Sequence, residues 1–173
     1  MYNKLNSSYK NLFPISIILI LTLSRLIPHP PNFTPLIAIA ILSTYLFANI
    51  YISLIAIFIS MFLSDIFIGF YNHMLMLFVY GALFFISYFI YIIKIKINFK
   101  NLFIFCFGSS LIFFLVSNFG VWFSGTLYEK NLNGLINCYI LAIPFFKNTF
   151  LSTIIFTYSA LVFSKFSVLH KKT

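Results

Sequence analysis

Residues 36–66 read LIAIAILSTYLFANIYISLIAIFISMFLSDI, and the number of times this stretch crosses a membrane decides the fold. The whole chain has 173 residues, of which 62% are hydrophobic and 8% are charged. Soluble domains carry about 25% charged residues, so the composition predicts an integral membrane protein surrounded by the lipid bilayer. A membrane-spanning helix needs about 20 residues. The 36–66 stretch is therefore either one long span or two short ones.

The positions of the basic residues decide between one crossing and two. Eight of the eleven lysines and arginines fall in three groups, namely Lys4 and Lys10; Lys94, Lys96 and Lys100; and Lys165, Lys171 and Lys172. Cytoplasmic segments are rich in Lys and Arg, so all three groups are expected inside. With the N-terminus inside, one crossing by 36–66 would put the last two groups outside, whereas two crossings with a turn near Asn49 keep all three inside. We therefore predict two crossings. The same placement suits anionic lipid headgroups and explains the net charge of +9 without a nucleic-acid partner.

The resulting prediction is an all-α integral membrane protein, a six-transmembrane-helix bundle with cytoplasmic N- and C-termini. Residues 1–173 form one membrane domain, a multi-pass protein of the inner (plasma) membrane. The expected spans are residues 12–27, 36–48, 50–67, 74–93, 102–122 and 147–164. Because Pro144 and Lys147 interrupt the last apolar run, 134–143 is predicted to be a separate interfacial or re-entrant helix. The 36–48 helix is only about 20 Å long against a hydrocarbon core of about 30 Å, so it is short or buries an end in the bundle.

Polar residues gather in the three connections on the side away from the lysine groups. These connections are 28–35, which reads PHPPNFTP, then 69–73, and the long segment 117–148. A binding site needs a few convergent polar groups in an apolar concavity, so we predict that the three connections form one outward-facing pocket. The expected ligand-binding residues are His29, Asn32, Asp65, His73, Asn118, Trp122, Tyr128, Asn137, Lys147 and Asn148.

Arg25 and Asp65 are expected to form a structural pair, because ionisable groups near membrane depth are costly and mark either a pair or a pathway. Direct ligand contact stays open as the alternative for both residues. The prolines of 28–35 predict a rigid connector between two helices, in which Thr34 or Asn32 caps the second helix.

Signals for metal binding and catalysis are weaker. His29, His73 and Cys138 are the candidate metal ligands by residue type, but their spacing matches no recognised motif, and hydrogen bonding within loops is the alternative for the histidines. Trp122 and Tyr128 either stack on a flat ligand or anchor the chain at the membrane interface. The sequence contains no G-x-S-x-G, no H-E-x-x-H and no P-loop. We therefore expect neither an enzyme nor a bound cofactor.

Four long motifs carry a family resemblance. They are RLIPHPPNFTPLIAIAI at 25–41, LSDIFIGF at 63–70, LVSNFGVWFSGTLY at 115–128 and GLINCYILAIPFFKNT at 134–149. In this order they resemble a family of small six-helix bacterial membrane proteins of unknown function, described as candidate transport proteins. That family is distantly similar, at the level of the fold, to the substrate-binding S components of energy-coupling factor transporters. S components are six-helix bundles with cytoplasmic termini that bind vitamins or metal ions through outer loops.

The resemblance implies a transport function. By position it places ligand-binding residues in the first outer loop (His29 and Asn32), near the end of the third span (Asp65 and His73) and in the segment 118–148. The expected activity is the capture of a small solute, vitamin-like or metal-containing, at the outward-facing pocket. The alternative is a non-transport membrane scaffold of an envelope complex.

One feature departs from the S-component pattern. S components that dock to an energy-coupling module often show A-x-x-x-A on the first helix, whereas residues 14–24 here read PISIILILTLS. An energy-coupling module is therefore a doubtful partner.

Overall fold

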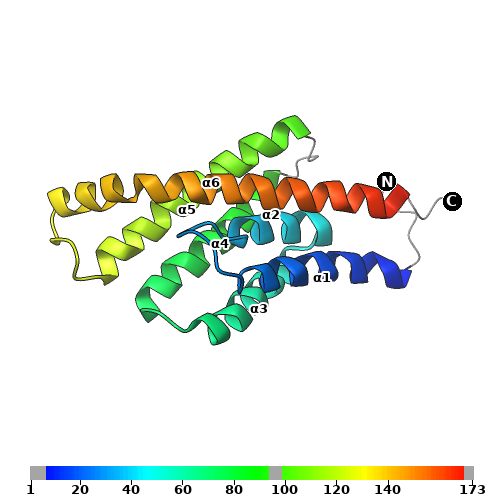
Figure 1. The fold of residues 1–173 in the computed structure, drawn as a ribbon, viewed down its shortest axis with the longest axis horizontal. Helices are drawn as coiled ribbons and strands as arrows, with labels where there is room; N and C mark the ends of the chain where they lie inside the picture. The colour runs from blue at the N-terminus through cyan, green and yellow to red at the C-terminus, as the bar shows by residue number, and fades with distance from the viewer. Residues whose placement is uncertain (1–6, 94–98, 170–173) are drawn as a thin grey trace.

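The computed structural model describes residues 7–93 and 99–169, and within these ranges the chain forms six α-helices and no β-strand (Figure 1). The helices are α1 (Ser7–Ser24), α2 (Leu36–Phe47), α3 (Ile50–Ile68), α4 (His73–Ile93), α5 (Phe99–Ser124) and α6 (Leu132–Leu169). The predicted all-α class is confirmed. Helices α2 to α5 begin and end within a few residues of the predicted spans.

Four helices are long and apolar enough to cross a membrane. They contain Ile50–Ile68, His73–Ile93, Asn101–Ser124 and Leu132–Ser164, with mean hydropathies between 1.5 and 2.2. The apolar parts of α1 and α2, Leu12–Ser24 and Leu36–Phe47, are shorter.

The helices bury hydroxyl groups and expose large apolar side chains. In α3, Ser60 and Ser64 are buried, whereas Phe58 and Phe67 are 48% and 75% exposed. Continuous exposed apolar surface of this kind marks a membrane-facing protein. The hydroxyls of buried serines donate hydrogen bonds to backbone carbonyls, as Ser64 Oγ does to Ser60 O at 2.7 Å. These polar groups are therefore paired inside the bundle. This distribution supports a membrane protein.

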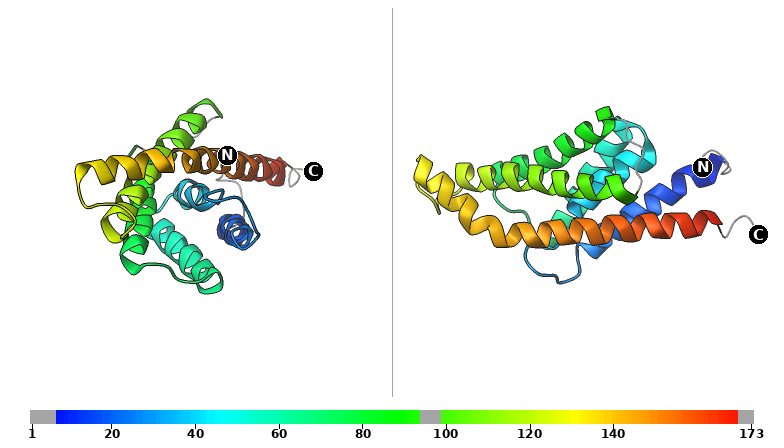
Figure 2. Two further views of the ribbon diagram at one scale, coloured as in Figure 1. Left: turned by 60° about the vertical axis from the view of Figure 1, so that its left-hand side comes forward. Right: turned by 90° about the horizontal axis from the view of Figure 1, so that it is seen from above.

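Helix α2 lies at the centre of the bundle and contacts each of the other five helices (Figure 2). Ten of its 12 residues are buried. At a rise of about 1.5 Å per residue it is about 18 Å long, so it is the short helix that the sequence predicts, enclosed by protein. Ser87 of α4 reaches it and donates a hydrogen bond to Ala40 O, 3.3 Å away.

The 36–66 stretch is two helices, as predicted, with the turn at Ala48 and Asn49. Ala48 adopts the left-handed conformation with φ of 53°, which commonly ends a helix. Asn49 begins the next helix, because its Oδ1 accepts hydrogen bonds from the backbone N–H groups of Tyr51 and Ile52 at 3.0 and 3.2 Å. A side-chain cap of this kind stabilises the first turn of α3.

The structure corrects the prediction for the last apolar run. The separate helix expected at 134–143 and the span expected at 147–164 are parts of one continuous helix, α6, which contains Pro144. A proline removes one backbone donor, but such a loss is tolerated in membrane helices that pack against neighbours. Beside this proline, Phe146 packs on Phe114 of α5 with 5.3 Å between ring centroids. Contact with α5 supports the helix through the proline.

The connections alternate between two ends of the bundle. The start of α1, the α2–α3 turn and the end of α6 lie toward one end, and the 25–35 and 69–72 connections face the other way (Figures 1 and 2). The 125–131 connection also faces that way, but the α5–α6 hairpin carries it well beyond the other two. The three polar connections therefore lie on one side of the bundle without meeting at one level.

Candidate functional site

An ion pair between Arg25 and Asp65 joins the end of α1 to the end of α3. Helix α1 ends at Ser24, earlier than the predicted end at 27, and the chain continues in a tighter turn with the Arg25 N–H donating to Thr22 O at 3.2 Å. The turn directs Arg25 into the bundle, where Nη2 lies 2.6 Å from Asp65 Oδ1. The two side chains are only 9% and 1% exposed. The structure thus forms the predicted pair.

Further polar groups satisfy the pair. Tyr80 of α4 donates its hydroxyl to Asp65 Oδ2 at 2.8 Å, and Arg25 Nη1 donates to Ser64 Oγ and to Met61 O, the latter at 3.4 Å. Met61, Ser64 and Asp65 share the buried face of α3 because helical residues three and four apart lie on one side. A buried charge is tolerated when it is paired and hydrogen-bonded, and this arrangement meets both conditions.

A cavity of about 210 Å³ lies beside Arg25. Its lining comes from four helices and from the 25–35 and 69–72 connections, namely Arg25, Asn32, Thr34, Leu36, Ile37, Tyr71, Val79, Phe113 and Thr149. Asp65 is not part of the lining, although Arg25, with which it is paired, is. The cavity therefore meets the guanidinium, several hydroxyls and an amide on some sides, and apolar side chains on the others.

The N-terminus of α2 also borders the cavity. Leu36 and Ile37, its first two residues, are part of the lining. Pro35 at the N-cap position supplies no side-chain cap, and the first backbone hydrogen bond runs from Ile39 N–H to Pro35 O at 2.8 Å. The predicted capping by Thr34 or Asn32 is therefore wrong. The first N–H groups of a helix carry a partial positive charge, which here lies next to the cavity.

The 28–35 connection is held in place by a turn and by α6. Phe33 N–H donates to Pro30 O at 3.0 Å, and Asn32 has φ of 60°. Proline at the second position and a positive φ at the third are typical of a type II turn. Asn148 of α6 then donates from Nδ2 to Pro31 O at 3.0 Å. The predicted connector is therefore held by contacts at both of these residues, with Asn32 in the cavity lining and Asn148 bonded to the turn.

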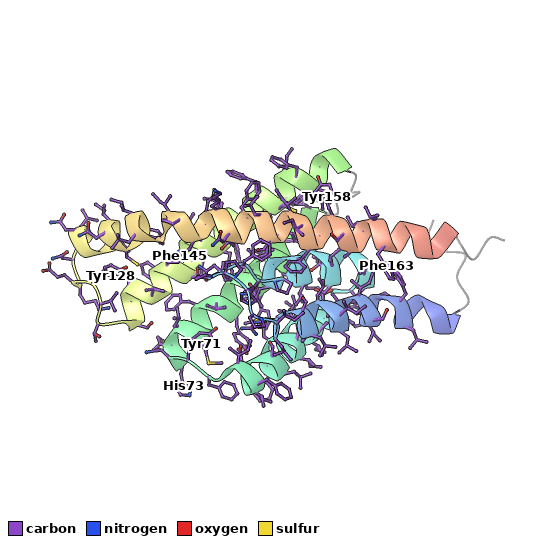
Figure 3. The ribbon with its side chains drawn as sticks, viewed as in Figure 1. Tyr71, His73, Tyr128, Phe145, Tyr158 and Phe163 are labelled. Atoms are coloured by element: carbon purple, nitrogen blue, oxygen red, sulfur yellow. The ribbon has the colours of Figure 1, made fainter. Side chains whose placement is uncertain are left out.

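The other predicted ligand-binding residues do not line this cavity. His29 is exposed, with Nδ1 3.1 Å from Pro30 O. His73 is exposed at the start of α4, and Asn137 and Lys147 are exposed on α6. Figure 3 shows Tyr128 at the α5–α6 tip, apart from Tyr71 at the α3–α4 connection.

The α5–α6 hairpin uses its polar residues for its own structure. Asn118 Nδ2 donates to Phe114 O at 2.8 Å, and Trp122 Nε1 donates to Glu129 O at 2.9 Å. Lys130 Nζ lies 5.6 Å from the centroid of the Trp122 ring and donates to the carbonyls that end α5, including that of Gly125 at 2.5 Å. These contacts close the hairpin tip.

The predicted metal ligands are not brought together. Across residues 7–93 and 99–169, no group of three or more His, Cys, Asp or Glu side chains is arranged to hold a metal ion. Cys138 is buried, with Sγ 3.4 Å from Asn118 O, while His29 and His73 are exposed on two other connections. The reason is geometric, because Cys138 belongs to the extended hairpin and the histidines belong to the shorter connections.

A family model described as a family of unknown function (DUF6580) matches residues 5–173. The chain belongs to this family. No curated protein and no solved structure matches the chain. For this member of DUF6580, the argument about function therefore rests on the site.

Sequence reasoning missed three residues that complete the site of this DUF6580 protein, which are Tyr71, Tyr80 and Ser64. The serine had a signal, since Ser60, Ser64 and the adjacent Asp65 follow the helical period in an otherwise apolar segment. The tyrosines had none, because the chain contains 11 tyrosines and no pattern marks the two that face Asp65.

Tyr71 lies in the connection before α4. Burial, and then the negative charge of Asp65, raises the pKa of Tyr71 to about 12. Its hydroxyl therefore stays protonated, and remains a hydrogen-bond donor, throughout the physiological range.

Proposed function

We propose that the chain is a membrane transport protein that captures a small solute in the cavity beside Arg25. In this proposal the protein crosses the inner (plasma) membrane six times, with both termini on the cytoplasmic side. The grouping of the lysines supports this orientation. The cavity then opens toward the outer side, where the 25–35 and 69–72 connections lie.

The observation that carries the proposal is the cavity itself. Four helices and two connections contribute to a space of about 210 Å³ next to a buried guanidinium. Sites that bind solutes are apolar concavities with a few placed polar groups, and the lining has this character.

The cavity volume limits the solute. Drug-sized ligands occupy about 300–1,000 Å³, and the cavity is smaller. A cavity of this volume holds several water molecules. We therefore propose a solute of that size in place of a large vitamin. The likeness to S components stays a prediction from the sequence motifs, and a metal-containing solute is no longer proposed.

Uptake by reconstituted protein tests the function. The purified chain would be analysed by native mass spectrometry for a co-purifying small molecule, and each identified compound would be assayed for uptake into proteoliposomes. The matched variants are Tyr71→Phe, which alters the cavity, and Tyr88→Phe, which alters an exposed tyrosine of α4. We expect uptake to fall in the first variant and to persist in the second. A membrane scaffold would transport nothing and would tolerate both changes.

Cysteine labelling tests the topology. Cys106 and Cys138 would first be replaced by Ala, and Asn98→Cys and Asn131→Cys would then be labelled separately with an impermeant reagent in intact cells. We expect labelling at position 131 and protection at position 98. The reverse pattern would contradict the six-span orientation.

A further inference from the structure

We infer that the cavity selects a small monocarboxylate, whose oxyanion binds between Arg25 and the N-terminus of α2 and whose short apolar body packs against Val79 and Phe113. This inference rests on the proposed function and adds the chemical class of the solute. It depends on the charge around the cavity, on the hydrogen-bond donors that line it and on the shape of its apolar side.

The charge around the cavity is positive on the side that faces the solute. Arg25 lines the cavity, whereas its partner Asp65 is buried and is not part of the lining. A guanidinium has five N–H donors. Those of Arg25 Nη1 bond Ser64 Oγ and Met61 O, and Nη2 forms the ion pair with Asp65. No acidic residue appears in the lining.

The N-terminus of α2 adds to this field. The helix begins at Leu36 without a side-chain cap, and its first residues border the cavity. Helix N-termini bind anions because their free N–H groups and the helix dipole both favour negative charge. The dipole is equivalent to about half an elementary charge. Since Asp65 already balances Arg25, this partial charge suits one negative charge on the solute and not two.

Two hydroxyls in the lining complete the donor set. Thr34 and Tyr71 both border the cavity, and among the described residues neither hydroxyl has a hydrogen-bond partner. Thr149 is different, because its hydroxyl donates to Phe145 O at 3.0 Å. The two hydroxyls come from the connections before α2 and before α4.

The remaining walls are apolar. The apolar part of the cavity lining consists of Val79 of α4, Phe113 of α5, and Leu36 and Ile37 of α2. A fully hydrated inorganic anion would leave these walls without a partner, whereas a short alkyl chain would be removed from water against them. The volume of about 210 Å³ admits a chain such as that of butyrate.

The test compares ligands that share a shape and differ in charge. Thermal shift and calorimetry on the full chain in detergent would use butyrate, butyramide, butylamine, succinate and inorganic phosphate. We expect butyrate to bind at least about tenfold more tightly than butyramide, which is the range of one charge-assisted hydrogen bond. We expect no binding of butylamine and weaker binding of succinate and phosphate.

Variants locate the binding site. Tyr71→Phe and Thr34→Val should each weaken butyrate binding by about tenfold. Their controls are Tyr88→Phe and Thr22→Val. These remove an exposed tyrosine hydroxyl and a buried threonine hydroxyl outside the cavity, and butyrate binding should be unchanged in both. Asp65→Asn should strengthen butyrate binding, because it frees the charge of Arg25. A purely structural role for the pair predicts no such gain.

The outcomes separate the two proposals. Equal binding of butyrate and butyramide, both sensitive to Tyr71→Phe, would overturn the anion class and leave a solute-binding cavity. Tight phosphate with no butyrate binding would overturn the monocarboxylate and keep an anion site. Absence of binding by every compound would overturn this inference, and the proposed function would then be decided by the co-purifying solute. Butyrate binding unaffected by Tyr71→Phe and Thr34→Val would place the site elsewhere and overturn the inference.

Discussion

The Asp65 carboxylate lies 2.6 Å from the Arg25 guanidinium, between Oδ1 and Nη2, and this contact ties α1 to α3 inside the bundle. Both side chains are almost fully buried. Breaking such a pair on one side leaves an uncompensated buried charge, whereas removing both partners does not. This asymmetry makes the pair testable in the absence of any ligand.

The two single substitutions of the pair, taken together, should cost more stability than the double substitution. We expect Arg25→Met and Asp65→Leu each to lower the free energy of unfolding by about 3–5 kcal/mol. The double variant should lose much less than the sum. Unfolding of the detergent-solubilised protein by a denaturing detergent gives the three values. Additive losses would show that the two side chains act independently.

Gly120→Ala should destabilise the contact between α4 and α5. A Cβ at this position would lie 2.5 Å from Phe78 Cβ and 2.7 Å from Phe78 Cγ, and atoms so close to the backbone cannot move aside cheaply. Overpacking of this kind costs about 1–3 kcal/mol. The measurement is the midpoint of thermal unfolding.

Gly108→Ala on the same helix is the matched control. No atom lies within 4 Å of the Cβ that it would add, and alanine favours a helix over glycine by about 1 kcal/mol. We expect this variant to be at least as stable as the natural chain. Equal losses for the two alanines would argue against the close α4–α5 contact.

Ala48→Gly should stabilise the protein. Ala48 has φ of 53°, and this left-handed conformation costs a residue with a Cβ about 1–2 kcal/mol. Glycine avoids that cost, offset by its greater freedom in the unfolded chain, so we expect a net gain below about 1 kcal/mol. Ala56→Gly, inside α3, should instead lose about 1 kcal/mol. In one denaturation assay, a gain in stability for Ala48→Gly and a loss for Ala56→Gly would support the left-handed conformation of Ala48. A loss in both variants would contradict it.

Stability should fall at high pH in a way that depends on Tyr71. The pKa of Tyr71 is raised from 10.0 to about 12, so above pH 10 the unfolded chain loses this proton while the folded chain keeps it. The folded state then binds more protons, and stability decreases as pH rises through this window. Melting at about pH 9 and about pH 11 should show a smaller loss for Tyr71→Phe than for Tyr88→Phe. Identical losses would contradict the raised pKa.

Much of the fold follows from hydropathy and the lysine positions. The turn at Asn49 and the limits of α2 and α3 were predictable because apolar length and positive charge are read along the chain. The continuity of α6 through Pro144 was not, because it depends on contacts with α5 that only the folded bundle supplies. A proline in a sequence indicates a break, and packing decides whether the break occurs.

The site was predictable in part. Arg25 and Asp65 stood out because charges are rare in this chain, and Asn32 because of its proline-rich turn. Tyr71 and Tyr80 did not, since the conformation of the 69–72 connection places the first and the rotation of α4 places the second. The alternation of the predicted spans put the tip of the α5–α6 hairpin at the same end of the bundle as the other two connections, as the structure has it. It carries no information on how far a hairpin extends. For that reason Trp122 and Tyr128 were expected at a pocket that they do not reach.

Helix α2 also bears on how the protein is made. Ribosomes release the chain from its N-terminus, so only α1 precedes Leu36–Phe47, and four of the five helices that surround it follow later. A helix of about 18 Å would have to thin a bilayer whose core is about 30 Å. The burial of α2 is therefore completed only when α5 and α6 have been synthesised, and a chain that stops after α4 leaves part of its central helix without the protein that covers it.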